Sequence, residues 1–295
     1  MTPTLVRQHT SHADSAPRVD LSARARDWSE IQERMLVPLY EAVYDRLDVG
    51  PATRLLGLRC GSGLALLMAA SRGAAVTGVD SASPERLALA RERLLPDTPP
   101  GRAGSRGGSG TRARTPARLV AGPPADAAGT DPAGYTLVTA FEPIGGLAGD
   151  SEGLGELLAD ALPLAGRGAA VVLAGWGPPE RCTTSSVLRV ATKLADPVCG
   201  ARTWRPARRD DLEKVAARAG LKPDGSGRVA CPFGYAGLDS AVRGLLSTGL
   251  FDAAITATDA KQVDKELMEA LHPHRRPDGT VWMPNVFRYL IARVP

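Results

Sequence analysis

The sequence predicts an α/β fold in which a mainly parallel sheet is covered by helices on both faces. Short apolar runs alternate with helical periodicity along most of the chain. A glycine-rich turn, Arg59-Cys-Gly-Ser-Gly63, separates the first of these runs from the helix that follows it. The chain has 295 residues, of which 43% are hydrophobic, so it can bury a core of this size.

The beginning of the chain is predicted to contain a tail and then a helical segment. Residues 1–24 are polar and lack periodicity, which is typical of a flexible tail. Apolar residues recur at helical spacing over 28–47, and Pro38 predicts a kink or a division into two short helices. We therefore expect one folded domain over 25–295.

From residue 54 onward, strands and helices are expected in alternation, as in a parallel sheet. Ser83 and Pro84 suit the cap and the first turn of one of the helices. The expected strands are 54–58, 75–79, 119–121, 135–140 and 168–174, and the expected helices are 64–71, 84–95 and 154–161.

Residues 101–116 interrupt this alternation with the sequence GRAGSRGGSGTRARTP, which has no large apolar side chain. We interpret the segment as a disordered insertion between a helix and a strand, on the side of the sheet away from a ligand crevice. Its arginines could bind phosphates. However, the formal net charge is only +4 and no aromatic residues stand among these arginines, which argues against nucleic-acid binding.

The last third of the chain is less regular. Helices are expected over 210–219, with Gly220 as C-cap, and over 239–246 and 260–271. Two strands are expected over 280–283 and 286–292. None of the four cysteines forms a C-x-x-C pair, and no apolar run is long enough to cross a bilayer. We therefore expect a reduced, cytoplasmic protein without a metal site or a membrane partner.

The glycine turn and the next apolar run together predict a ligand site. Glycines let the backbone approach a ligand closely, and the free N–H groups of a helix N-terminus favour negative charge. The second run, Val76-Thr-Gly-Val-Asp80, ends in a carboxylate that can accept hydrogen bonds from ribose hydroxyls. Its distance from the turn is close to the roughly 20 residues typical of such an acid. A structural turn with a solvated aspartate is the alternative interpretation.

These segments resemble the class I S-adenosylmethionine-dependent methyltransferases, over most of the chain. The resemblance extends through Tyr135 to Phe141, Ala169 to Gly177, Trp176 to Cys182, and Arg276 to Tyr289, which look like a bacterial small-molecule branch. It implies a Rossmann-like, seven-stranded sheet whose last strand is antiparallel. It also implies a helical lid from 25–47 and parts of 183–280, and a cofactor site at the residues Cys60, Gly61, Gly63, Asp80, Ser81, Gly122 and Phe141.

The chain departs from the family pattern at three positions. The family usually has an acid at Gly57, which orients the cofactor's ammonium group, and a glycine at Arg59. It often has an acid at Pro123, which receives the adenine amino group. Arg59 could point away, fill part of the pocket, or face the cofactor carboxylate.

The sequence is therefore consistent with two functions. The first is an S-adenosylmethionine-dependent methyltransferase that acts on a small molecule, with Glu142 and His272 as candidate catalytic residues. The second is a catalytically inactive protein of the same fold, which would regulate, carry a ligand or bind a protein partner. A dehydrogenase is disfavoured because Leu66 stands where the full G-x-G-x-x-G motif has its last glycine.

Overall fold

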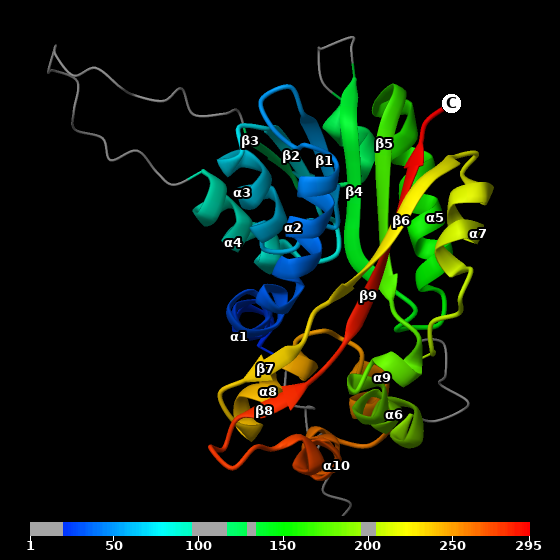
Figure 1. The fold of residues 1–295 in the computed structure, drawn as a ribbon. Helices are drawn as coiled ribbons and strands as arrows, with labels where there is room; N and C mark the ends of the chain where they lie inside the picture. The colour runs from blue at the N-terminus through cyan, green and yellow to red at the C-terminus, as the bar shows by residue number, and fades with distance from the viewer. Residues whose placement is uncertain (1–19, 96–116, 129–133, 196–204) are drawn as a thin grey trace, which may run out of the picture.

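A seven-stranded sheet forms the centre of the molecule (Figure 1). In the computed structural model, residues 20–95, 117–128, 134–195 and 205–295 are described, so the predicted insertion at 101–116 and most of the predicted tail lie outside them. The strand order is β3-β2-β1-β4-β5-β9-β6. The strands are β1 (Arg54–Leu58), β2 (Ala75–Val79), β3 (Ala117–Val120), β4 (Tyr135–Ile144), β5 (Ala165–Trp176), β6 (Lys222–Ala230) and β9 (Val286–Arg293).

The strands β1 to β5 pair in parallel, whereas β9 is antiparallel to both of its neighbours, β5 and β6. The predicted fold class is thus confirmed: seven strands, with the last one in the chain antiparallel. Parallel strands run in one direction, so β1, β2 and β4 bring their carboxyl ends to the same edge of the sheet. The glycine turn and Asp80 both lie at this edge.

Helices cover both faces of the sheet. Alternate residues of one strand serve the two faces: Leu55 belongs to one apolar cluster and Leu56 to the other, and both are fully buried. One face packs against α2 (Val37–Arg46) and α3 (Leu64–Ser71), with α4 (Pro84–Leu94) beside them. The other packs against α5 (Asp150–Ala161) and α7 (Asp211–Arg218).

A second layer lies beyond the carboxyl ends of the strands, at the lower end of the molecule in Figure 1. It contains a small antiparallel sheet, β7 (Phe233–Tyr235) with β8 (Val281–Met283). Around it lie the helices α6 (Thr184–Leu194), α8 (Leu238–Leu246), α9 (Asp252–Ala257) and α10 (Ala260–Leu271). The chain contributes its N-terminal helix α1 (Leu21–Asp27) to the same region.

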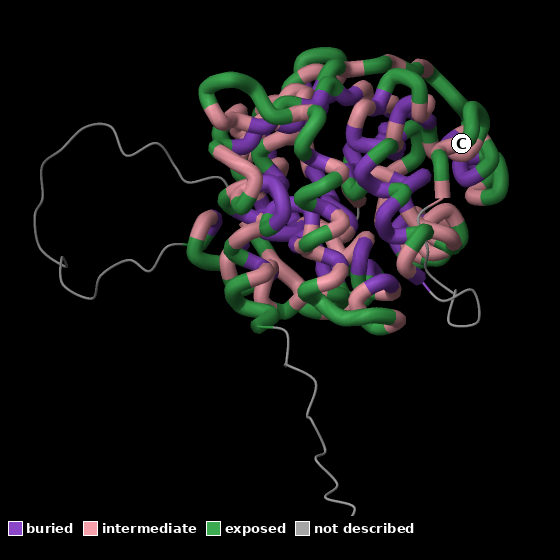
Figure 2. Tube along the Cα trace, turned by 90° about the horizontal axis from the view of Figure 1, so that it is seen from below, coloured by how far each residue is buried: buried purple, intermediate pink, exposed green. Residues whose placement is uncertain are grey.

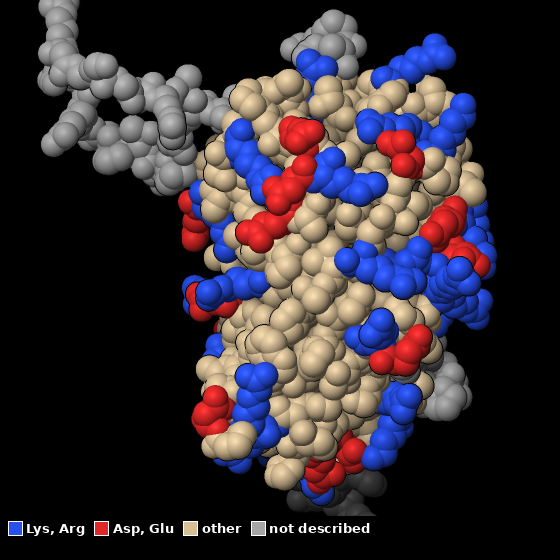
Figure 3. Space-filling view, viewed as in Figure 1, with Lys and Arg blue, Asp and Glu red and all other residues tan. Residues whose placement is uncertain are grey.

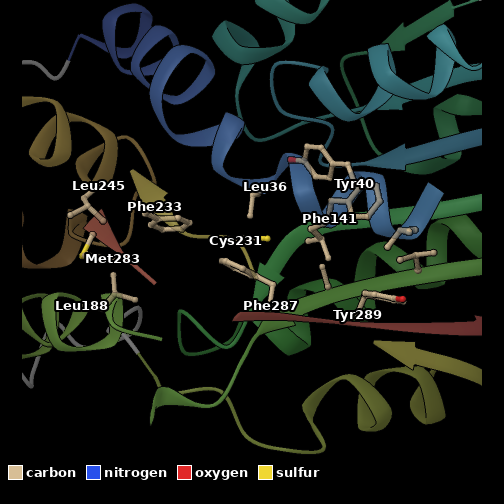
Figure 4. Packing of buried hydrophobic residues seen from close by; sticks show 14 of the residues in the cluster. Leu36, Tyr40, Phe141, Leu188, Cys231, Phe233, Leu245, Met283, Phe287 and Tyr289 are labelled. Carbon is tan, nitrogen blue, oxygen red and sulfur yellow. The ribbon is translucent and has the colours of Figure 1, made fainter. Parts of the chain in front are cut away.

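One apolar core joins the sheet to this second layer. Figure 4 shows Phe141 of β4 beside Tyr40 of the N-terminal segment, and Phe287 of β9 on the side of Phe233, which belongs to the second layer. Figure 2 shows the buried residues gathered inside and the exposed ones around the rim. Because the core is continuous, the two layers hold each other in place.

Two sequence-based expectations are corrected and one is confirmed. The chain is helical from Leu21, capped by Asp20, so the predicted tail ends before residue 24. The predicted division near Pro38 is confirmed: a π-helical turn over Trp28–Gln32 and a 3₁₀ turn over Glu33–Leu36 come before α2, which has Pro38 in its first turn. Strand β4 extends to Ile144, so Glu142 lies within the strand instead of beyond its end. Among the described residues, no helix has the length and apolarity that crossing a membrane requires.

Candidate functional site

The glycine turn connects β1 to α3 in left-handed backbone. Arg59, Gly61 and Gly63 have φ values of 45°, 56° and 77°. This region is readily accessible to glycine but costs energy for a residue with a Cβ. The amide of Cys60 donates to Val79 O at 3.1 Å, which ties the turn to the end of β2. The turn therefore opens toward the crevice beside Asp80.

Asp80 is held at this crevice by backbone amides. Its Oδ2 accepts a hydrogen bond from Gly61 N at 3.2 Å, and its Oδ1 accepts from Ala82 N at 2.8 Å and Ser83 N at 3.2 Å. The side chain is nearly buried, and this burial raises the pKa of the carboxyl, while the three amides oppose the rise. Ser83 also caps α4 by accepting from Arg86 N, as predicted.

A buried carboxylate from the N-terminal segment faces the glycine turn. Glu33 is 3% exposed and forms a hydrogen bond with Ser62 Oγ and an ion pair with Arg93 Nη1 at 3.0 Å. Its second oxygen lies 3.4 Å from Leu64 N, at the start of α3. A carboxylate is favoured at this place because the first N–H groups of a helix have no partner inside it.

Trp28 covers the same turn with its indole edge. A Cβ placed on Gly61 would lie 3.2 Å from Trp28 Nε1, and this nitrogen is buried with no hydrogen-bond partner. The indole ring stacks on the guanidinium of Arg86, 4.2 Å from the ring centre. Arg86 in turn donates to Ser247 O at 2.7 Å, which connects α4 to the end of α8.

Together these side chains enclose a pocket at the carboxyl ends of β1, β2 and β4. Four of the predicted cofactor residues line it: Cys60, Gly61, Asp80 and Phe141. Burial and the neighbouring Asp80 raise the pKa of the Cys60 thiol to about 12, so this thiol stays protonated at neutral pH. The open space is about 60 Å³, against roughly 300 Å³ or more for a typical ligand pocket. A nucleoside-sized ligand would therefore require side chains of the lining to move apart.

At Gly57, where the family usually has an acidic residue, the space that an acidic side chain would occupy is filled by Leu66. A Cβ on Gly57 would lie 2.8 Å from Leu66 Cδ2, which is closer than two carbon atoms pack. Leu66 comes from α3 and is buried. An acidic side chain at this position would therefore require Leu66 to move.

Arg59 lines the first pocket and pairs with a residue of β4. Its Nη1 lies 3.0 Å from Glu142 Oε2, and both side chains line the first pocket and a second, adjoining one. The second pocket is lined mainly by apolar side chains, including Trp176, Phe233 and Phe287. The ion pair thus lies between the two pockets.

The remaining predicted site residues do not line the first pocket. Gly63 begins α3, where a Cβ would crowd Ala90, and Ser81 is exposed beside Asp80. At Gly122 the carboxylate of Asp126 lies against the glycine, so an acid stands close by although Pro123 cannot supply one. The catalytic candidate His272 follows α10, is exposed, and lines neither pocket.

Three residues of the site were not predicted from sequence: Trp28, Glu33 and Arg86. The one signal that could have found Glu33 is its place among apolar residues, between Ile31 and Leu36, in a stretch that must be buried. For Trp28 and Arg86 the sequence offers no comparable signal, because their stacking joins two segments that are far apart along the chain.

Several solved structures with a similar fold are of candidate methyltransferases. A candidate methyltransferase from Bacillus halodurans C-125 matches with a TM-score of 0.51 and 13% identity, over 87% of this chain and 98% of its own. A candidate type II methyltransferase from Anaeromyxobacter dehalogenans matches with a TM-score of 0.51 and 18% identity, over 86% and 95%. No family model and no curated protein matches the sequence. The chain therefore has the fold of the class I methyltransferases.

The first pocket offers hydrogen-bond donors and acceptors of the types that the functional groups of S-adenosylmethionine need. The carboxylate of Asp80 can accept from hydroxyl groups, and the unpartnered Trp28 Nε1 can donate to a carboxylate. Glu33 lines the same pocket as a carboxylate paired with Arg93. No cluster of His, Cys, Asp or Glu within the described part of the chain could hold a metal ion.

Proposed function

We propose that this chain binds S-adenosylmethionine in the first pocket and transfers its methyl group to a small-molecule acceptor in the second. The observation that carries the proposal is Asp80, a nearly buried carboxylate at the end of β2 that accepts from Gly61 N and faces the pocket. A carboxylate in this position is suited to the two hydroxyls of a ribose.

The residues divide between the two halves of the cofactor. Asp80 holds the ribose, and the backbone of Cys60 to Gly63 lets the ligand approach closely. Trp28 Nε1 donates to the amino-acid carboxylate and Glu33 accepts from the ammonium group, in place of the acid absent at Gly57. Phe141 lines the adenosine side of the pocket, whereas Ser81 and Gly122, with Asp126 beside it, lie outside the lining, where the adenine would extend beyond the pocket. When bound, the cofactor supplies an electrophilic methyl group.

The chain's part in the transfer is mainly alignment. A methyl transfer needs the acceptor atom to be held in line with the methyl group, and needs a base only where the acceptor carries a proton. Glu142 lies between the two pockets and is the candidate base. Its ion pair with Arg59 holds it at this boundary. His272 is exposed and lines neither pocket, so we assign it no role in the transfer.

The first experiment is calorimetric titration with S-adenosylmethionine, S-adenosylhomocysteine and 5′-methylthioadenosine. The last of these has the adenosine but lacks the amino-acid part. Comparing its affinity with that of S-adenosylhomocysteine therefore separates binding of the adenosine half from binding of the amino-acid half. We expect micromolar binding of S-adenosylhomocysteine. The variants Asp80→Ala and Asp80→Asn should weaken all three ligands at least tenfold, whereas Trp28→Phe should weaken only the ligands that carry a carboxylate.

The opposite result favours the second candidate function. Absence of heat and of thermal stabilisation at millimolar cofactor would mean that Leu66, Arg59 and Pro123 have abolished the site. The chain would then be an inactive relative, and the search would turn to protein partners. The cytoplasmic location and the partner remain predictions. The surface in Figure 3 shows basic and acidic side chains interspersed, without a single basic face in that view.

A further inference from the structure

The second pocket has a composition that selects its ligand. It adjoins the first pocket at Arg59 and Glu142 and lies under the second layer of the molecule. Most of its described lining is aliphatic or aromatic, and its open space is about 100 Å³. An apolar cavity of roughly 150 Å³ is known to hold one benzene ring, so the space suits part of a small hydrophobic compound.

Three aromatic rings form one wall of this pocket. Trp176 lies with its ring centre 4.6 Å from that of Phe287 and 5.8 Å from that of Phe233. The two phenylalanine rings are stacked, with an interplanar angle of 29° and 6.0 Å between centres. Figure 4 shows Phe233 and Phe287 directed into the space between the sheet and the second layer. Phe287 and Phe233 are buried, whereas Trp176 is half-buried, so Trp176 is the ring of the three that a ligand can contact. An aromatic surface of this kind favours a ligand that is itself flat and apolar.

Every charged side chain among the described residues of the lining is already paired. Arg59 and Glu142 pair with each other. Asp150 Oδ2 accepts from the amides of Gly145, Gly146 and Leu147 at 2.6, 2.9 and 3.0 Å, and its Oδ1 lies 3.6 Å from Arg205. A ligand charge would therefore be buried without a partner, which is costly.

Two neutral polar side chains of the lining are engaged within the protein, whereas Trp28 Nε1 has no hydrogen-bond partner. Gln32 Oε1 accepts from Tyr235 Oη at 3.0 Å. Thr248 Oγ1 donates to Leu245 O at 2.6 Å and accepts from Leu250 N at 3.2 Å. The pocket thus offers apolar contact and few hydrogen bonds to its ligand.

We propose that the second pocket takes an uncharged, hydrophobic compound with a planar ring, and that this is the methyl acceptor. The part that concerns the acceptor rests on the proposed function. The ring would lie against Trp176, which itself packs on Phe233 and Phe287. The atom to be methylated would be directed toward the boundary at Glu142, which is the side of the pocket shared with the first one.

The test compares three probes of one shape and different charge: 2-naphthol, 2-naphthoate and 2-naphthylmethylammonium. Each is titrated calorimetrically into the protein at neutral pH, with and without saturating S-adenosylhomocysteine. We expect saturable binding of 2-naphthol that persists with the cofactor product present. Both charged probes should bind at least tenfold more weakly, because their charge would have no partner.

A matched pair of variants locates the binding. A Cβ on Gly146 would lie 3.2 Å from Trp176 Nε1 and 3.4 Å from Leu250 Cδ2, so Gly146→Leu fills the pocket. Gly155, on α5, has open space around it, so Gly155→Leu makes the same chemical change elsewhere. We expect at least a tenfold loss of 2-naphthol affinity in the first variant and no change in the second. Leu250→Phe is the second filling variant, should Gly146→Leu not fold.

The outcomes separate this inference from the proposed function. Equal binding of the charged probes, unchanged binding in both filling variants, or no saturable binding of 2-naphthol by the unmodified protein would overturn the ligand class. Absence of S-adenosylhomocysteine binding would overturn the proposed function instead. The naphthol series would still report on the pocket, because it does not depend on the cofactor.

Discussion

Arg59 Nη1 lies 3.0 Å from Glu142 Oε2, so that an ion pair joins the end of β1 to β4 between two adjoining pockets. From the sequence, the Arg59 side chain could point away, fill part of the pocket or face the cofactor carboxylate. In the structure it is paired with a carboxylate of the chain itself. Both side chains are more than a third exposed, at 37% and 44%, so the pair contributes only about 0–1 kcal/mol to stability. Its importance lies in its position.

The backbone at Arg59 predicts a measurable strain. With φ at 45°, a residue with a Cβ costs about 1 kcal/mol more than glycine. Arg59→Gly and Arg59→Ala both remove the ion pair, but only the first relieves the strain. We expect the glycine variant to be about 1 kcal/mol more stable than the alanine variant, as measured by urea unfolding. Equal stabilities would show that the turn carries no strain.

Much of the fold could be predicted because its signals are local. The runs 54–58 and 75–79 and the helices 64–71 and 260–271 have the bounds that the apolar pattern gave. Strand β6 was missed because it holds two glycines and a proline, and its residues alternate only between exposed and half-exposed at the sheet edge. Such a strand is stabilised by its pairing with β9, which no local pattern reveals.

The site was less predictable, because its parts come from distant segments. The glycine turn and Asp80 are near each other in sequence and both line the pocket. Glu33 reaches the same turn only through the irregular helix before Pro38, which places a charged residue inside. The loss of the acid at Gly57 was visible in the sequence. That Leu66 fills its place was not, since this depends on how α3 packs on β1.

The contact between Gly57 and Leu66 gives a second prediction. Gly57→Asp should destabilise the protein by about 2 kcal/mol or more, since the new side chain collides with Leu66 and buries a charge. Leu66→Ala alone should also cost about 2–5 kcal/mol, because it leaves a cavity. The double variant should be more stable than the sum of the two losses implies, by about 1 kcal/mol or more. Additive losses would mean that the two residues do not compete for this space.

The ion pair of Glu33 with Arg93 gives a third prediction. Glu33→Gln leaves a largely buried guanidinium without its carboxylate, so we expect a loss of about 2 kcal/mol in urea unfolding. Arg93→Met added to Glu33→Gln should restore part of that loss, because no unpaired charge then remains. A double variant that is worse than Glu33→Gln alone would contradict this account.

The same variant separates a structural role of Glu33 from a binding role. If Glu33 holds the cofactor's ammonium group, Glu33→Gln weakens S-adenosylhomocysteine at least tenfold and leaves 5′-methylthioadenosine unchanged. If Glu33 only anchors the N-terminal segment over the pocket, both ligands change together. Calorimetric titration of the two ligands, at a temperature where the variant is fully folded, distinguishes these outcomes.

The buried carboxyl of Asp80 gives a pH dependence with two opposite signs. Burial raises its pKa in the folded state, so its negative charge is disfavoured there relative to the unfolded chain. The contribution of Asp80 to stability is therefore present at acid pH and is lost as the pH rises through the folded-state pKa. Ligand binding needs the charged form, so the affinity for 5′-methylthioadenosine should instead fall as the pH decreases through the same window.

The neighbours of Asp80 do not obscure this test. Glu142 raises the pKa of Asp80 further, and Cys60 stays protonated throughout the window. Arg86 keeps its charge at these pH values, although burial lowers its pKa. The stability advantage of the native protein over Asp80→Asn should thus be larger in acid than at neutral pH. The binding advantage of the native protein should shrink in acid. If the binding advantage of the native protein over Asp80→Asn did not shrink in acid, Asp80 would not be the group that holds the ribose.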